Sequence, residues 1–127
     1  MNARIGAGFL ATVLIVLAAP ASAQTASPAP SPAVIARGDS LFHGAGNCYA
    51  CHGAKAEGLV GPNLTDAEWI HSKGTYEDIV KQIHEGVPKE QAKSGIPMPP
   101  KGGSTISDDD IKAVAAYVHS LAQKPKS

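Results

Sequence analysis

The sequence Cys48-Tyr49-Ala50-Cys51-His52 sets two thiols three positions apart, with an imidazole directly after the second. In one turn of a helix, residues three apart share a face, so both sulfurs reach a common partner from the same side. This spacing is the pattern of covalent c-type haem attachment, in which the two cysteines form thioethers with the porphyrin. The stretch therefore predicts one haem c, attached through Cys48 and Cys51, with His52 supplying an axial nitrogen to the iron.

A Cys-x-x-Cys pair has three other common uses. A thioredoxin-like redox pair belongs to a strand-helix-strand context, but no alternating β-branched run precedes Cys48. A zinc site needs two further ligands at matching spacing, and the chain holds only 2 cysteines. A plain disulfide in an exported protein is the third use. The adjacent His52 and the features described below favour haem.

The first 23 residues have the composition of an export signal. Arg4 precedes an apolar run over residues 5–19, and the Ala-Ser-Ala sequence at 21–23 gives a small-x-small cleavage pattern. The run is shorter than the roughly twenty residues that span a bilayer, so we expect a cleaved signal and a periplasmic mature protein that begins near Gln24. Residues 24–32 are rich in Ala, Ser and Pro and are expected to form a solvated linker.

The rest of the chain is expected to form one domain over residues 33–123, followed by a short tail over 124–127. The whole chain has 11 basic and 11 acidic residues, so no basic surface for nucleic acid is indicated. Aromatic residues are few in the expected domain, and a porphyrin would fill the thin core that they provide. They are Phe42, Tyr49, Trp69, Tyr76 and Tyr117.

Apolar periodicity and capping residues predict four helices, over residues 33–43, 65–72, 76–85 and 108–123. The first has Ser31 as its N-cap and Pro32 at its first position. Each later helix begins at a Ser or Thr followed three residues on by an acid, as in a capping box. These pairs are Thr65 with Glu68, Thr75 with Asp78, and Ser107 with Asp110.

The stretch 87–103 contains four prolines, and we expect no regular structure in it. No alternation typical of strands appears, so the predicted fold class is all-α. Gly38, inside the first helix, costs up to about 1 kcal/mol relative to alanine, which suggests that another backbone approaches it closely.

With these segments placed, residues 34–121 resemble class I cytochrome c, the family of small soluble monohaem carriers. The shared marks are GDSLFHGAGNCYACHG at 38–53, GPNLTD at 61–66, IPMPP at 96–100 and SDDDIKAVAAYVHSL at 107–121. The resemblance implies three main helices and one or two short ones around the haem. It also implies that the N- and C-terminal helices cross, with Gly38 and Phe42 facing Val114 and Tyr117. Residues 62–69 resemble, more weakly, the c-type haem subunits of bacterial terminal oxidases.

Met98 is the only methionine after residue 1, and a proline stands on each side of it. A thioether suits low-spin haem iron, and pairing with histidine raises the reduction potential. The resemblance places the second axial ligand at Met98. A lone methionine also serves as an apolar gap filler. The competing ligands are His43, His71, His84 and His119.

Further site residues come from the resemblance. It implies that the Pro62 carbonyl accepts a hydrogen bond from the second ring nitrogen of His52, unless this proline merely forms a turn. Trp69 either donates its indole N–H to a haem propionate or fills the core. Three lysines flank the segments where the family leaves a haem edge exposed, and they either steer an acidic partner or are simply solvated. They are Lys55, Lys93 and Lys101.

An iron with both axial positions filled leaves no site for a substrate. We therefore expect a monomeric one-electron carrier and no catalytic residues, with a membrane-bound donor and a terminal oxidase or reductase as its redox partners. Weak, short-lived contacts suit such a carrier. Two alternatives stay open. One is a haem-bearing subunit tethered to a membrane oxidase or reductase complex, and the other is a haem enzyme or gas sensor in which Met98 does not bind the iron.

Overall fold

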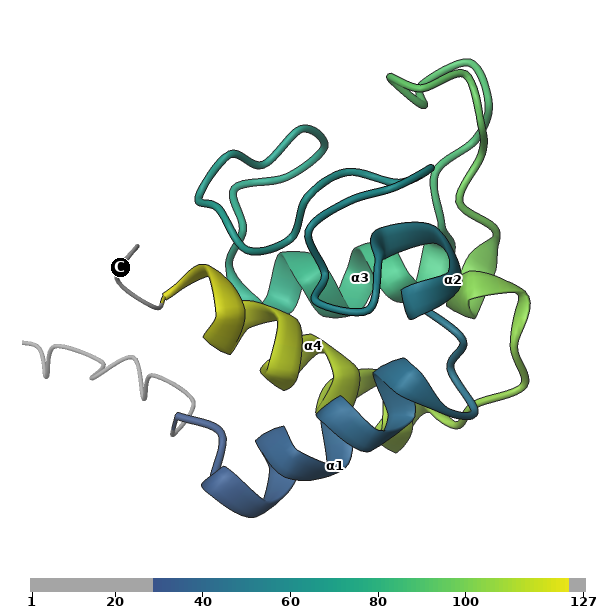
Figure 1. Cartoon of the computed structure of the whole chain (residues 1–127). Helices are drawn as coiled ribbons and strands as arrows, with labels where there is room; N and C mark the ends of the chain where they lie inside the picture. The colour runs from purple at the N-terminus through teal and green to yellow at the C-terminus, as the bar shows by residue number, and fades with distance from the viewer. Residues whose placement is uncertain (1–28, 124–127) are drawn as a thin grey trace, which may run out of the picture.

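The computed structural model describes residues 29–123. The expected signal over 1–23, most of the linker and the tail over 124–127 lie outside the described residues. Figure 1 shows the elements in chain order: α1 (Pro32–His43), α2 (Tyr49–His52), α3 (Tyr76–Glu85), the 3-10 helix η1 (Pro100–Gly103) and α4 (Asp108–Ala122). Over residues 29–123 there is no strand, and the predicted all-α fold class is confirmed. No helix in this range is long and apolar enough to cross a membrane.

The N- and C-terminal helices cross at Gly38, as expected. A Cβ atom at Gly38 would overlap the Ala113 carbonyl and lie 2.8 Å from the Tyr117 Cβ. Next to this contact the rings of Phe42 and Tyr117 meet edge to face with centroids 5.4 Å apart. Figure 1 shows α1 lying across α4 on the side away from α3. Only a residue without a side chain allows this approach of the two backbones.

The ends of α1 and α4 follow the predicted caps. Ser31 Oγ accepts a hydrogen bond from the Val34 N–H at 3.4 Å, and Pro32 is the first residue of α1. At α4, Ser107 Oγ accepts from the Asp110 N–H at 3.2 Å, while Asp110 Oδ2 accepts from the Ser107 N–H at 3.1 Å. Arg37 reaches the same Asp110 carboxylate at 2.5 Å and so ties α1 to the start of α4.

The predicted helix over 65–72 is wrong, because this segment forms bends. Asn63 Oδ1 accepts hydrogen bonds from both the N–H and the hydroxyl of Thr65, at 2.8 and 2.7 Å. Asp66 Oδ1 accepts from the Glu68 N–H at 3.1 Å. The side chains of Asn63 and Asp66 therefore bind N–H groups that would be free at the start of a helix. The Thr65 hydroxyl donates to Asn63 and does not cap the Glu68 N–H.

Two smaller expectations also need correction. Thr75 Oγ1 caps α3 by accepting from the Asp78 N–H at 3.2 Å, but the Asp78 carboxylate binds the Lys73 N–H at 3.1 Å, so the reciprocal half of the capping box is not made. Residues 87–103 are not wholly irregular, because Pro100 begins the short helix η1. Proline tolerates this first position because its missing N–H has no partner to lose there.

Candidate functional site

A cavity of about 380 Å³ lies beside the helical core and is lined mostly by apolar side chains. Its walls come from α2, α3, α4 and the two long loops. All six residues expected to hold or contact the cofactor line this cavity: Cys48, Cys51, His52, Pro62, Trp69 and Met98. A second hollow of about 440 Å³, between α3 and α4, contains none of them.

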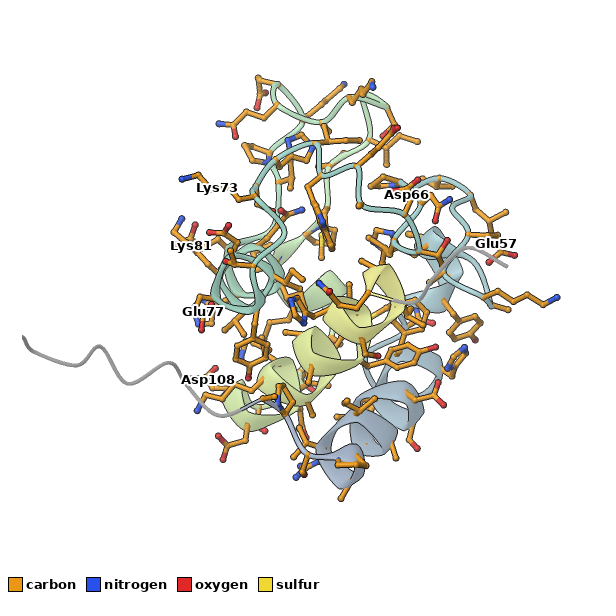
Figure 2. The ribbon with its side chains drawn as sticks, turned by 90° about the vertical axis from the view of Figure 1, so that its left-hand side faces the viewer. Glu57, Asp66, Lys73, Glu77, Lys81 and Asp108 are labelled. Carbon is orange, nitrogen blue, oxygen red and sulfur yellow. The ribbon has the colours of Figure 1, made fainter. Side chains whose placement is uncertain are left out.

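The labelled charged side chains of Figure 2 point outward from the fold rather than toward its centre.

The helical turn α2 brings both thiols to the cavity. Cys48 is the N-cap of α2, and its carbonyl accepts from the Cys51 and His52 N–H groups at 3.2 and 3.0 Å. Burial raises the pKa of the Cys48 thiol to about 11, and the neighbouring Cys51 adds to this shift. A buried thiolate is therefore costly at this position, whereas a thioether carries no charge and removes the cost.

His52 is held in one ring orientation. The residue is 9% exposed, and Nδ1 lies 3.0 Å from the Pro62 carbonyl oxygen. A carbonyl only accepts hydrogen bonds, so Nδ1 carries the ring proton and Nε2 keeps its lone pair for a metal. Burial lowers the pKa of His52, with the Pro62 bond opposing the shift, which favours the neutral imidazole that metal binding requires. A Cβ atom at Gly61 would lie 2.9 Å from His52 Cε1, so the ring packs flush against this glycine.

The chain folds back over its own motif to place Pro62. The Gly58 N–H donates to the His52 carbonyl at 2.7 Å, and the Gly61 N–H donates to the Cys51 carbonyl at 2.8 Å. These two bonds return the loop to the attachment turn, so that the residue after Gly61 faces the His52 ring.

Met98 is fixed by the end of α3. Val87 and Met98 exchange two backbone hydrogen bonds, with N···O distances of 2.8 and 2.9 Å. Gly86 precedes this pair, and a Cβ atom there would overlap the Met98 carbonyl. The Met98 side chain packs against the core cluster at the cavity wall. Sequence reasoning missed Val87 and read Gly86 only as a helix end. The glycine itself was the signal available in the sequence, because glycine is favoured where the backbone has a positive φ. In the structure the φ of Gly86 is +73°.

The competing histidines fall into two groups. His71 lines the cavity together with His52, whereas His43, His84 and His119 do not. In His43, Nε2 lies 2.7 Å from the Ala54 carbonyl and Nδ1 lies 2.9 Å from the Asp39 carbonyl. Within residues 29–123, Met98 and His71 are thus the two proposed second ligands that line the cavity.

Trp69 and the three flanking lysines take different places. Trp69 lines the cavity and packs its indole against Gly74, whose missing side chain makes room for it. Lys55 is exposed, and Lys93 is exposed on the cavity rim. Lys101 is not a free surface cation, because its ammonium donates to the Ile106 carbonyl at 3.0 Å.

The donor set fits a covalently attached haem. Two thiols from one helical turn, an imidazole with its Nε2 lone pair available and a thioether all line the same apolar cavity. Porphyrin is a large apolar group that such a cavity accommodates, and the sulfur and nitrogen donors match haem attachment and ligation. The residues present therefore agree with the haem c predicted from the Cys-x-x-Cys-His motif.

Comparisons with known proteins give one consistent family. A family model described as "Cytochrome C oxidase, cbb3-type, subunit III" matches residues 33–118. The cbb3-type cytochrome c oxidase subunit CcoP of Rubrivivax gelatinosus is 42% identical over 98 residues, covering 76% of this chain and 29% of that protein. Subunit FixP of Rhizobium meliloti (strain 1021) is 35% identical over 97 residues, covering 73% of this chain and 30% of that protein. This chain thus spans under a third of the length of these two relatives.

A solved structure supports the fold. The crystal structure of cytochrome cL from the marine methylotrophic bacterium Methylophaga aminisulfidivorans superposes with a TM-score of 0.57 and 27% identity. The match covers 71% of this chain and 54% of that one.

Proposed function

Because the chain belongs to the cbb3-type cytochrome c oxidase subunit III family of c-type cytochromes, we propose that it delivers electrons, one at a time, to a membrane-bound terminal oxidase. It carries haem c and acts as a redox carrier, as the family and its relatives imply. The finer assignment, to an oxidase complex rather than to a free periplasmic shuttle, rests on the CcoP and FixP subunits among its relatives.

One observation carries the proposal: Cys48, Cys51 and His52, from a single helical turn, and Met98, from a distant loop, line one cavity. In this proposal the two cysteines hold the porphyrin covalently, and His52 and Met98 bind the iron. When bound, the haem supplies a one-electron couple. With His52 and Met98 as its two protein ligands, the iron would have no site left for a substrate, which supports a carrier rather than an enzyme.

The protein's own groups set how that couple behaves. The bond between His52 Nδ1 and the Pro62 carbonyl orients the ring and raises its basicity as a ligand. The backbone pair between Val87 and Met98 holds the thioether loop against α3. Trp69 forms part of the cavity wall.

The sequence supports a periplasmic location. We propose export by residues 1–23, which puts the haem domain in the periplasm, and the Ala/Pro/Ser-rich residues 24–32 then act as a linker. If the apolar segment is retained, this linker tethers the domain beside a membrane complex. The expected partners are redox proteins, not nucleic acid.

Fractionation of the native host tests the assignment to a complex. Membranes are solubilised in mild detergent, and the chain is followed on native gels by haem staining. We expect it to migrate with an oxidase, and we expect the reduced holoprotein to be re-oxidised by those membranes only when oxygen is present. Recovery in the osmotic-shock fraction, together with no re-oxidation by oxidase-containing membranes, would favour the free shuttle.

Carbon monoxide tests the carrier role separately. Ferrous wild-type protein is expected to bind the gas slowly or not at all near neutral pH, whereas Met98→Ala opens the axial position and binds it readily. Rapid binding by the wild type would favour a gas sensor or haem enzyme.

A further inference from the structure

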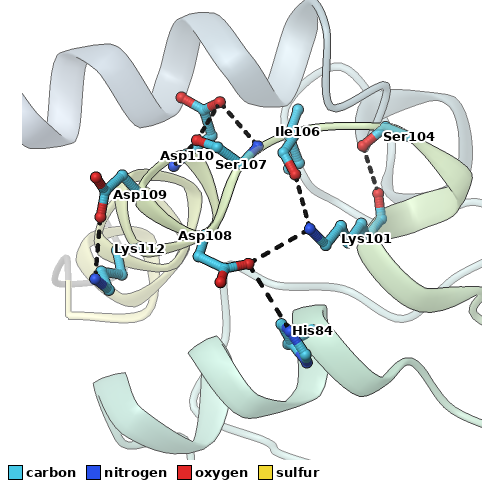
Figure 3. A network of polar contacts seen from close by, with 9 residues as sticks. All are labelled: His84, Lys101, Ser104, Ile106, Ser107, Asp108, Asp109, Asp110 and Lys112. Carbon is cyan, nitrogen blue, oxygen red and sulfur yellow. Dashed lines mark hydrogen bonds and ion pairs between the residues drawn. The ribbon is translucent and has the colours of Figure 1, made fainter.

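Lys101 lies three residues after Met98 and bonds to the start of α4. Its Nζ donates to the Ile106 carbonyl at 3.0 Å and to Asp108 Oδ1 at 3.4 Å (Figure 3). The Lys101 side chain is 30% exposed, and Ile106 is buried in the core. The same Asp108 carboxylate lies 3.8 Å from His84 Nε2 on α3. A lysine that the sequence suggests as a surface cation therefore joins the Met98 loop to the helical core.

The backbone of Lys101 gives a second reason to look at this residue. Its φ of 57° and ψ of 23° lie in the left-handed region, which costs a residue with a Cβ atom on the order of 1 kcal/mol. Gly102 and Gly103 follow in the same region, where glycine has no such cost. The Lys101 carbonyl also accepts from the Ser104 N–H and hydroxyl, at 3.1 and 2.7 Å. Both the side chain and the backbone carbonyl of Lys101 therefore form hydrogen bonds that stabilise this turn.

The connection from Lys101 to Met98 is stiff. Pro99 and Pro100 separate the two residues, and each proline ring fixes its φ angle. On the other side, Val87 clamps the Met98 backbone through two hydrogen bonds. Met98 is therefore held from two sides, by Val87 and by Lys101 through the two prolines, and without the Lys101 anchor the loop keeps only the Val87 contact.

We propose that Lys101 is a positioning residue for Met98: its ammonium, anchored on the Ile106 carbonyl, holds the methionine loop closed over the cavity. This inference rests on the proposed binding of iron by Met98. It assigns the lysine a role inside the protein rather than at a partner surface. The Asp108 contact adds less than the Ile106 contact, because an exposed ion pair contributes little.

Competition with imidazole tests this role in the ferric holoprotein. Added imidazole occupies the sixth position only when Met98 leaves, so its half-saturating concentration reports how firmly the loop is held. Lys101→Gln loses the charged donor, and we expect a half-saturating concentration about five- to tenfold lower than in the wild type. Lys101→Arg keeps a charged donor and is expected to stay within about twofold of the wild type.

Two further variants separate positioning from charge and from strain. Lys112→Gln removes the same charge from an ion pair with Asp109 on α4 and is expected to leave imidazole binding unchanged. Lys101→Gly relieves the left-handed strain but loses the anchor, so imidazole should bind as readily as in Lys101→Gln while resistance to guanidinium changes little. Should Lys101→Gln yield no holoprotein, Lys101→Gly carries the test alone.

The outcomes are distinct. Wild-type behaviour of both Lys101→Gln and Lys101→Gly, or an equal shift in Lys112→Gln, would overturn the positioning role while leaving ligation by Met98 intact. If instead the wild type binds imidazole as readily as Met98→Ala and lacks the thioether charge-transfer band, the proposed ligation fails and the inference falls with it.

Discussion

Val87 and Met98 exchange both of their backbone hydrogen bonds, so the methionine loop is attached to the residue that follows the C-cap of α3. The contact requires Gly86, because a side chain there would meet the Met98 carbonyl. The end of a helix thus determines where the thioether lies, although the two segments are separated by the loop over residues 88–97.

Gly86→Ala is expected to lower the free energy of unfolding by about 3 kcal/mol or more, because strain at positive φ adds to a clash with the Met98 carbonyl. It should also weaken the thioether charge-transfer band of the ferric protein. Gly95→Ala is the control, since Gly95 has a φ of +71° but nothing within 4 Å of its Cβ position. Its expected cost is about 1 kcal/mol with the band intact. Equal spectra from the two variants would show that Gly86 does not support Met98.

Gly61→Ala is expected to raise the reduction potential by roughly 30 mV. This is half of the 59 mV that corresponds to a tenfold change in the equilibrium constant of a one-electron couple. The new methyl group pushes against the His52 ring and weakens its bond to the Pro62 carbonyl, which makes the imidazole a poorer donor to ferric iron. Protein-film voltammetry measures the shift. Pro62→Ala keeps the carbonyl and should shift the potential less. An unchanged potential in Gly61→Ala would remove the role assigned to this hydrogen bond.

His43 provides a pH-dependent contact. The bond to the Ala54 carbonyl, and next the bond to the Asp39 carbonyl, raise the pKa of His43 above its ordinary value of 6.5. Both ring nitrogens face acceptors, so only the imidazolium donates to both. A raised folded-state pKa means that the stabilisation is complete below 6.5 and disappears as pH rises through the folded-state value.

His43→Asn should therefore lower the free energy of unfolding more at about pH 5.5 than at about pH 9. The difference between the two pH values should be less than about 1 kcal/mol, because the His43 side chain is 37% exposed and solvent screens its charge. Guanidinium unfolding at the two pH values gives the difference. His119→Asn, which removes a histidine outside this contact, should keep the wild-type profile. A cost for His43→Asn that is equal at both pH values would mean that the imidazolium adds nothing.

Gly38→Val is expected to cost about 3 kcal/mol or more, because its side chain would enter the Ala113 carbonyl and separate α1 from α4. Ala36→Val places the same side chain at an exposed position of α1 and should cost less than about 1 kcal/mol. Thermal unfolding of the holoproteins compares the two. Similar melting temperatures would mean that the helices do not depend on contact at Gly38.

Sequence signals that act over a few residues predicted most of the fold. Ser31, Thr75 and Ser107 each bind a backbone N–H three residues ahead, so α1, α3 and α4 begin where the pattern says. The error at 65–72 has a local cause as well, because Asn63 and Asp66 compete for the same donors. The Thr65 and Glu68 pair therefore starts no helix, because these neighbouring carbonyl and carboxylate oxygens already bind the Thr65 and Glu68 N–H groups.

The site divides in the same way. Cys48, Cys51 and His52 are adjacent in sequence, so their spacing alone predicts their chemistry. The support of Met98 by Val87, and the turn of Lys101 toward the core, depend on where distant backbone segments meet. No local pattern encodes those meetings, and the sequence accordingly suggested Lys101 as a surface cation.

The most direct test of the proposed iron ligation is near-infrared magnetic circular dichroism of the ferric holoprotein, since the charge-transfer band distinguishes methionine from histidine or lysine opposite His52. We expect the methionine signature in the wild type and in His71→Asn, and its loss in Met98→Leu. A bis-histidine signature that disappears in His71→Asn, or a high-spin ferric spectrum in the wild type, would contradict binding by Met98.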